Sequence, residues 1–129
     1  MPIEKTGDPK EPAGSTVFAH GGFHRAEGSE TAVVAETSLG IYDSSQFKEL
    51  VLLSNVTAIA GVGATLVFRV YNVDIIGTRI GTALITNSHT ATGSLRATAT
   101  VIGNKIEITK QLSGTTPTTT ATVELQMKT

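Results

Sequence analysis

The last dozen residues of the chain alternate between small or apolar side chains and polar ones. Thr119, Ala121, Val123, Leu125 and Met127 take every second position, and hydroxyl, carboxylate or amide side chains stand between them. A period of two is typical of a β-strand that buries one face and exposes the other. The pattern therefore predicts a late strand of an antiparallel sheet or sandwich.

Similar short segments, separated by turn residues, follow one another from about residue 30 onward, which is the spacing of an all-β sandwich or barrel. A helix is expected only as a turn near residues 44–49. The expected strands are residues 31–37, 47–57, 65–73, 78–86, 95–101, 105–112 and 118–127. The sequence thus predicts an all-β fold, an antiparallel β-sandwich of about seven strands that is either immunoglobulin-like or a jelly roll.

Particular segments refine this prediction. The run Leu50–Leu53 is continuously apolar, as in a central strand that is covered on both faces. Gly103 and Asn104 form a two-residue hairpin signal between the fifth and sixth strands. Turns or connections are expected at residues 38–45, 60–63, 72–77, 87–93 and 113–117.

Residues 1–29 differ in composition from the rest of the chain. They hold three of the four prolines and five of the 13 glycines, without sustained periodicity. Such a segment cannot bury enough apolar surface to offset its ordering entropy when it is alone. We interpret residues 1–29 as an extended N-terminal arm and residues 30–129 as the sandwich domain, the alternative being a disordered leader.

The arm carries bulky apolar side chains that could anchor it in the groove of a partner, namely Val17, Phe18 and Phe23. Packing of Phe23 on its own sandwich is the alternative. In the third expected strand, Arg69 and Tyr71 face outward, where an edge could meet a partner. Tyr and Arg are enriched among the residues that dominate binding energy, so both join the candidate partner-binding residues.

Composition narrows the functional classes. A chain of 129 residues is one ordinary domain, and without cysteine its redox compartment stays open. The net charge is −1 and the basic residues are scattered, which argues against direct binding to nucleic acid. The sequence shows neither a signal peptide nor an apolar run long enough for a membrane span. With 21 threonines but only six Phe and Tyr and no Trp, it favours a Thr-rich sheet and offers few aromatic platforms for sugars.

Catalytic chemistry is not evident. The sequence contains no nucleophile elbow and no cysteine nucleophile, and the segment Gly61–Gly63 lacks the remaining glycine and the following helix of a dinucleotide site. His20 and His24 flank two glycines that argue against a helical metal site, and joining them to His89 would require a coincidence of folding. We therefore expect no enzyme activity, no catalytic residues, no cofactor and no metal.

Two segments of the chain carry a resemblance to a known group of proteins. They are Asn55–Leu66, which reads NVTAIAGVGATL, and Leu112–Pro117, which reads LSGTTP and leads into the alternating last strand. Together they resemble small β-sandwich structural proteins of tailed bacteriophages, over about residues 47–127. The chain departs from that pattern at Ile106–Ile108, where an Arg is more usual, and lacks the Trp-containing loop that often precedes it.

The resemblance implies a virion protein, most specifically a capsid decoration (cement) protein on the outside of a phage head. Its implied partners are the major capsid protein or other virion proteins, bound as a homo-oligomer or as many copies on a lattice. The implied location is the capsid surface, after synthesis in the host cytoplasm. Two alternatives stay open: a tail or neck component, and a carbohydrate-binding or adhesion module.

Overall fold

The computed structural model describes residues 15–18, 21–100 and 103–129, and the described chain is all-β and antiparallel. Its strands are β1 (Ser15–Phe18), β2 (Gly21–Glu30), β3 (Val34–Asp43), β4 (Glu49–Val73), β5 (Arg79–His89), β6 (Gly93–Thr100) and β7 (Lys105–Lys128). No helix that meets the length and apolarity needed to span a bilayer occurs in the described part of the chain. The turn expected near residues 44–49 is present at residues 45 and 46, where the Phe47 amide donates a hydrogen bond to the Ser44 carbonyl at 3.1 Å.

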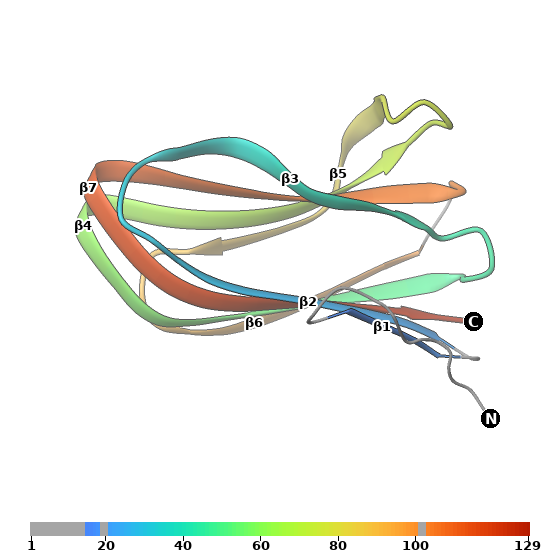
Figure 1. The fold of residues 1–129 in the computed structure, drawn as a ribbon, viewed down its shortest axis with the longest axis horizontal. Helices are drawn as coiled ribbons and strands as arrows, with labels where there is room; N and C mark the ends of the chain where they lie inside the picture. Colours follow the sequence, from blue (N-terminus) through green and yellow to red (C-terminus); the bar gives the residue numbers. More distant parts are fainter. Residues whose placement is uncertain (1–14, 19–20, 101–102) are drawn as a thin grey trace.

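The two longest strands, β4 and β7, run side by side along their whole length and bend together from one layer of the sandwich into the other (Figure 1). In one layer the first half of β4 pairs with the second half of β7, and the order is β1-β2-β7-β4-β6. In the other layer the second half of β4 pairs with the first half of β7, and the order is β3-β7-β4-β5. We call these the first and second layers.

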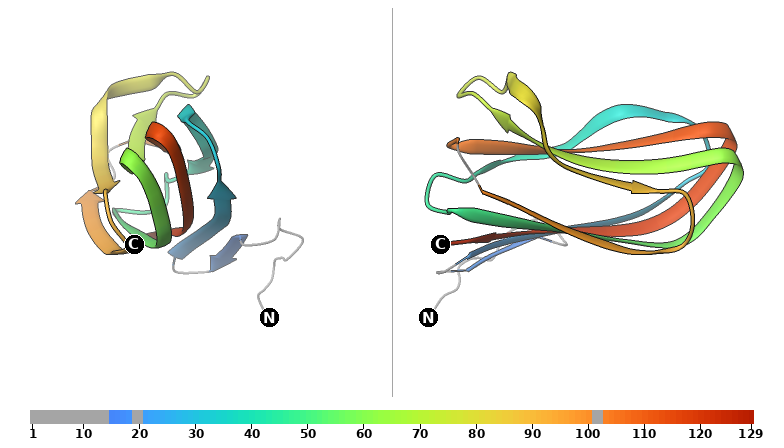
Figure 2. Two further views of the ribbon diagram at one scale, coloured as in Figure 1. Left: turned by 90° about the vertical axis from the view of Figure 1, so that its left-hand side faces the viewer. Right: turned by 180° about the vertical axis from the view of Figure 1, so that it is seen from behind.

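This connectivity distinguishes between the two predicted sandwich types. When the halves of β4 and β7 are counted separately, they make eight strands with β2, β3, β5 and β6, in two packed sheets. The chain crosses repeatedly between the two sheets: β2 of the first layer leads to β3 of the second, and β5 of the second layer leads to β6 of the first. Such an arrangement is a jelly roll. Figure 2 shows both bends from the end and from behind.

The glycine-rich segments that the sequence indicated as strand ends are instead the bends of β4 and β7. Gly61 (φ +115°) and Gly114 (φ +124°) adopt backbone conformations that favour glycine. A Cβ on Gly61 would stand 2.8 Å from the Cα of Pro117, and one on Gly114 would stand 2.8 Å from the Cα of Ala64. The two bends therefore pack against each other at a separation that a side chain would prevent.

Several strand boundaries in the structure differ from those that the sequence predicted. The expected third strand is the second half of β4, and the expected sixth and seventh strands are both part of β7. The expected hairpin at Gly103 and Asn104 is wrong, because β6 pairs with β4 in the first layer whereas β7 starts in the second. Residues 31–33 connect two strands instead of beginning one, and β3 continues through the expected connection at 38–43.

The core lies between the layers. The alternation in the last strand is confirmed, because Ala121, Val123, Leu125 and Met127 are buried. The central position of Leu50–Leu53 is also confirmed, since this part of β4 pairs with both β6 and β7. The largest fully buried side chains include Phe68, Leu50, Leu52, Leu66, Ile106, Leu112 and Leu125. Full burial of one such side chain contributes about 1.5–3 kcal/mol.

The predicted N-terminal arm is in part a strand pair in this structure. β2 pairs with β7 in the first layer, and β1 pairs with β2 at the edge of that layer. Residues 1–14 of the arm lie outside the described residues. The division into residues 1–29 and 30–129 stays a prediction.

Candidate interaction surface

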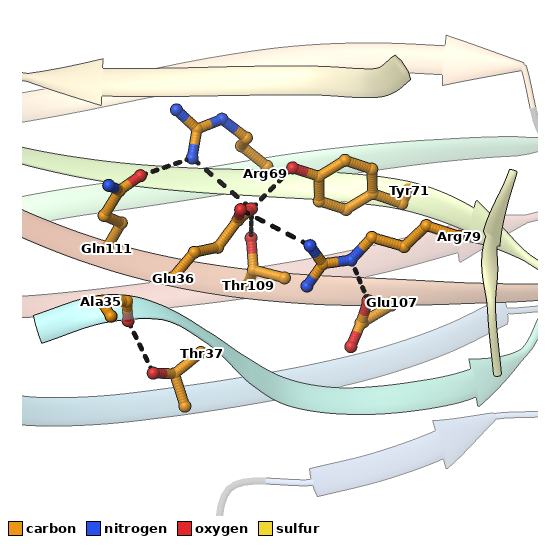
Figure 3. A network of polar contacts seen from close by, with 9 residues as sticks. All are labelled: Ala35, Glu36, Thr37, Arg69, Tyr71, Arg79, Glu107, Thr109 and Gln111. Carbon is orange, nitrogen blue, oxygen red and sulfur yellow. Dashed lines mark hydrogen bonds and ion pairs between the residues drawn. The ribbon is translucent and has the colours of Figure 1, made fainter. Parts of the chain in front are cut away.

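The outer face of the second layer carries a polar network centred on Glu36 of β3 (Figure 3). Its Oε2 atom accepts hydrogen bonds from the Tyr71 hydroxyl at 2.6 Å and from the Thr109 hydroxyl at 2.8 Å. The guanidinium of Arg69 lies 3.5 Å from the same oxygen and donates to Gln111 Oε1 at 2.8 Å. One carboxylate therefore connects side chains of β3, β7 and β4.

Arg79 extends this network to β5. Its Nε donates to Glu107 Oε1 at 2.7 Å, and its Nη1 lies 3.5 Å from Glu36 Oε1. The guanidinium also stacks over the Tyr71 ring, 4.4 Å from the ring centroid, which is a cation–π geometry. The Glu107 side chain is 9% exposed and the Arg79 side chain is 37% exposed, so the acid forms the inner part of the pair.

Strand register explains why these side chains meet. Tyr71 stands opposite Glu107, and Arg69 stands opposite Thr109, on the neighbouring strands β4 and β7. Because alternate residues of a strand share one face, all four side chains project from the same side of the layer. Cross-strand pairs of this kind stabilise a sheet and hold each other in fixed rotamers.

The contacts within the network shift the pKa values of Glu36, Tyr71 and Arg79, each in the direction that stabilises the hydrogen-bonded form. The Tyr71 hydrogen bond has the largest effect on the pKa of Glu36 and lowers it. Burial opposes this effect, and Thr109, Arg79 and Arg69 lower the pKa further. The same hydrogen bond raises the pKa of Tyr71. The hydrogen bond to Glu107 raises the pKa of Arg79. These directions favour an ionised Glu36 and a protonated Arg79 at neutral pH.

Beside this face, the hairpin between β4 and β5 projects from the sandwich (Figure 1). It carries exposed isoleucines. Ile75 is 80% exposed, Ile76 is 82% exposed and Ile80 is 56% exposed. The Asp74 carboxylate holds the tip, because it accepts hydrogen bonds from the amides of Ile76 at 3.0 Å and Thr78 at 2.9 Å. The isoleucines thus sit on an ordered turn, which we call the isoleucine hairpin (residues 74–80).

The predicted partner-binding residues fall into two groups. Arg69 and Tyr71 do face outward and lie in one network, but the expected edge position is wrong, because β4 lies between β7 and β5. Val17 and Phe18 are in β1 and Phe23 is in β2, at the edge of the first layer. Their side chains lie outside the described part of the structure. The binding role of all five residues stays a prediction.

Sequence reasoning missed Glu36, Arg79 and the exposed isoleucines. Glu36 is in β3, which begins at Val34, whereas the sequence pattern placed the start of this strand at residue 31. Arg79 pairs with Val73 across the turn between β4 and β5, and the local sequence pattern did not predict this pairing. The consecutive apolar pair Ile75–Ile76 beside the turn residues Asp74 and Gly77 was the available signal, since apolar side chains at a loop tip are solvated unless something covers them.

A second polar cluster lies inside the sandwich. Ser54 Oγ is 2.7 Å from His89 Nε2, and Asn87 Nδ2 donates to Ser54 Oγ at 3.1 Å. All three residues are at most 4% exposed, and burial lowers the pKa of His89. A serine buried this deeply is out of reach of a substrate, so the cluster satisfies core polar groups. The predicted loop at residues 87–93 is accordingly wrong at its start, where Asn87 and His89 belong to β5.

Among the described residues, no group of three or more His, Asp or Glu side chains is placed to hold a metal ion. His20 lies outside the described residues, and His89 is in the core beside Ser54.

The fold is similar to those of several solved structures. No family model and no curated protein matches the chain. A Bacillus endospore appendage protein, from a family of disulfide-linked pili, is similar with a TM-score of 0.51 and 14% identity, covering 95% of this chain and 98% of that one. The SPBc2 prophage-derived protein YomS has a TM-score of 0.49 and 16% identity over 88% of this chain and 99% of its own.

A protein of the T13 particle of infectious bursal disease virus has a TM-score of 0.47 and 13% identity over 98% of this chain, which corresponds to 36% of the viral chain. At 14% identity, the likeness to the endospore appendage protein shows a shared fold alone.

Proposed function

We propose that this chain is a virion structural protein, and specifically a decoration protein that binds the outside of a bacteriophage head. The observation that carries the proposal is the outer face of the second layer, where an immobilised Arg–Tyr–Glu network adjoins exposed isoleucines. The resemblance of residues 55–66 and 112–117 to phage structural proteins supports the same role.

The network is suited to binding a protein surface. Arg and Tyr dominate the energetics of many interfaces, and Arg69, Tyr71 and Arg79 are held in place before any partner arrives. A side chain that is already fixed loses little conformational freedom on binding, which otherwise costs about 0.5–1.5 kcal/mol for each flexible side chain. Repetition of such a contact over a lattice raises the overall affinity without any new contact.

The N-terminal residues 1–29 belong to the proposal as the element that reaches a neighbouring subunit. Val17, Phe18 and Phe23 are the proposed anchors. Because the described strand pairing begins at Ser15, removal of residues 1–14 leaves every described pair intact. A chain without residues 1–14 keeps all three proposed anchors and should bind shells as the natural chain does, whereas Val17→Ala/Phe18→Ala should bind shells more weakly.

The direct test uses heads assembled from the major capsid protein of the phage genome that encodes this chain. The purified chain should sediment with the heads and raise their melting temperature, and the double variant Arg69→Ala/Arg79→Ala should bind less. Heads that neither bind the chain nor melt later in its presence would contradict the decoration role. Binding to tail tubes instead of heads would favour a tail component.

A second candidate is a subunit of a filament. The similarity to the endospore appendage protein at a TM-score of 0.51 favours it. This chain has no cysteine, so its own joints would be non-covalent, unlike those of disulfide-linked pili. Electron microscopy of the concentrated chain separates the candidates, since a filament subunit assembles without any shell.

A further inference from the structure

The structure contains an apolar pocket between its two layers for which the proposed function gives no role. It has a volume of about 70 Å³ and opens at the side of the sandwich where β2 and β3 lie. Its walls include Leu39, Leu66, Phe68, Ala121 and Val123. Since a single water needs about 15 Å³ by this kind of measure, the pocket has room for part of an aliphatic side chain.

Two features distinguish this pocket from the rest of the core. Thr119, which is 4% exposed, lines it, and its Oγ1 atom has no hydrogen-bond partner among the described residues. A buried hydroxyl without a partner is costly, so this part of the core is not fully satisfied. At the mouth, Lys110 and Glu30 form an ion pair that connects the two layers.

The isoleucine hairpin of the same chain has the complementary properties. Ile75 and Ile76 are the most exposed large apolar side chains of the described residues. The hairpin carries Asp74 and Arg79, and the mouth of the pocket carries Glu30 and Lys110. Because Arg79 is already paired with Glu107 and Glu36, the charge that a seated hairpin can offer is Asp74, placed beside Lys110 while the isoleucines are buried.

The hairpin cannot enter the pocket of its own molecule. It begins where β4 ends, at Val73, whereas the pocket wall is formed by Leu66 of the same strand. Seven residues of strand separate these points by about 23 Å. The occupant must come from another molecule.

We propose that the isoleucine hairpin of one copy inserts Ile75 or Ile76 into the pocket between the layers of a second copy. The two surfaces differ, so the contact is heterologous, and its repetition gives a ring or an open chain rather than a closed dimer. Two aliphatic side chains offset only part of the cost of association, so each contact is weak and assembly depends on concentration. The inference rests on the proposed function only in treating the chain as part of a repeating assembly.

Crosslinking tests this contact sharply, because the natural chain has no cysteine. The double variant Gly28→Cys/Ile76→Cys places one thiol at the mouth and one on the hairpin. Gly28 lines the pocket, and a Cβ there meets nothing within 4 Å, so the variant should fold. With a short bismaleimide the concentrated protein should give a ladder of oligomers. An equal mixture of the two single variants should give dimers only.

The matched control is Gly28→Cys/Val62→Cys, because Val62 is 79% exposed but lies at the bend of β4. A ladder of equal strength from this control, or absence of a ladder from the test variant, would overturn the proposal. Dimers formed by Ile76→Cys alone would also overturn it, since they indicate a symmetric contact between hairpins.

Sedimentation of cysteine-free variants gives an independent measurement. Ile75→Asp/Ile76→Asp should raise the dissociation constant of self-association by about 100-fold or more. Gly28→Leu should block the mouth with a similar effect, whereas Gly28→Ala should not. If all variants associate like the natural chain, the proposal is wrong. Binding of the same variants to phage heads is measured separately, so that loss of self-association and loss of decoration are distinguishable.

Discussion

The Tyr71 hydroxyl donates a 2.6 Å hydrogen bond to Glu36, although Tyr71 is in β4, Glu36 is in β3 and β7 lies between the two strands. Thr109 of the intervening strand donates to the same carboxylate oxygen. The contact thus ties three adjacent strands together on the outer face of the second layer, and hydrogen bonds to a carboxylate are stronger than those between neutral groups.

Replacement of either partner should lower the free energy of unfolding. Tyr71→Phe removes one donor to a charged acceptor and should cost about 1.5 kcal/mol, the lower end for such bonds because the site is partly exposed. Glu36→Gln should cost a similar amount, since it leaves Arg69 and Arg79 without their shared carboxylate. Urea unfolding at pH 7 measures both. Glu49→Gln, at an exposed position of β4, is the matched control and should be near neutral.

Acid should remove the contribution of Glu36. The folded chain holds the pKa of Glu36 below its ordinary value of 4.5, so the unfolded state binds a proton first as the pH falls. The stabilisation is complete above about pH 4.5 and is lost below it, as the pH passes through the lowered pKa. Urea unfolding between pH 7 and pH 3 should show the natural chain and Glu36→Gln converging. Parallel curves would show that the carboxylate contributes nothing through its charge.

His89 predicts a second pH effect at milder acidity. Burial lowers its pKa from the ordinary 6.5, so below pH 6.5 the unfolded state takes up a proton that the folded state excludes. Stability should fall below pH 6.5 by at most about 1.4 kcal/mol per pH unit. In a background with His20 and His24 replaced by Asn, His89→Gln should be less stable at pH 8 and flat down to pH 5.5. A slope that persists in His89→Gln would assign the effect to another group.

The paired bends predict an unusual sensitivity to the smallest substitution. Gly61→Ala and Gly114→Ala each force a side chain into a positive-φ conformation and against a backbone atom at 2.8 Å. Each should cost about 1–3 kcal/mol in the free energy of unfolding. Gly28→Ala, where a Cβ meets nothing within 4 Å, should change it by less than about 1 kcal/mol. Equal effects at the three sites would contradict the close packing of the bends.

The sequence predicted the fold class because strand periodicity is local. The burial of Ala121, Val123, Leu125 and Met127 follows from alternation alone, and the central place of Leu50–Leu53 follows from its continuous apolar character. Strand ends could not be predicted in this way. Gly61 and Gly114 have the composition of turns, and only long-range packing, of Gly61 against Pro117 and of Gly114 against Ala64, shows that both strands bend without ending.

The candidate interaction surface was predicted only in part. Outward alternation placed Arg69 and Tyr71 correctly on one face. The expected edge position was wrong, because the pairing of β4 with both β5 and β7 is long-range and cannot be seen in the local pattern. The inward row Ile85, Asn87 and His89 shows the same limit, since polar residues that satisfy each other inside a core have the composition of a loop.

The shared bends of β4 and β7 also determine how the molecule would respond to tension. Because each of these strands belongs to both layers, the layers cannot be pulled apart by disrupting side-chain packing alone. Covalent backbone crosses between them twice, inside the most central strand pair of the fold. A load applied to opposite faces would therefore be carried along peptide bonds, and the two layers should yield as one mechanical unit in a force experiment.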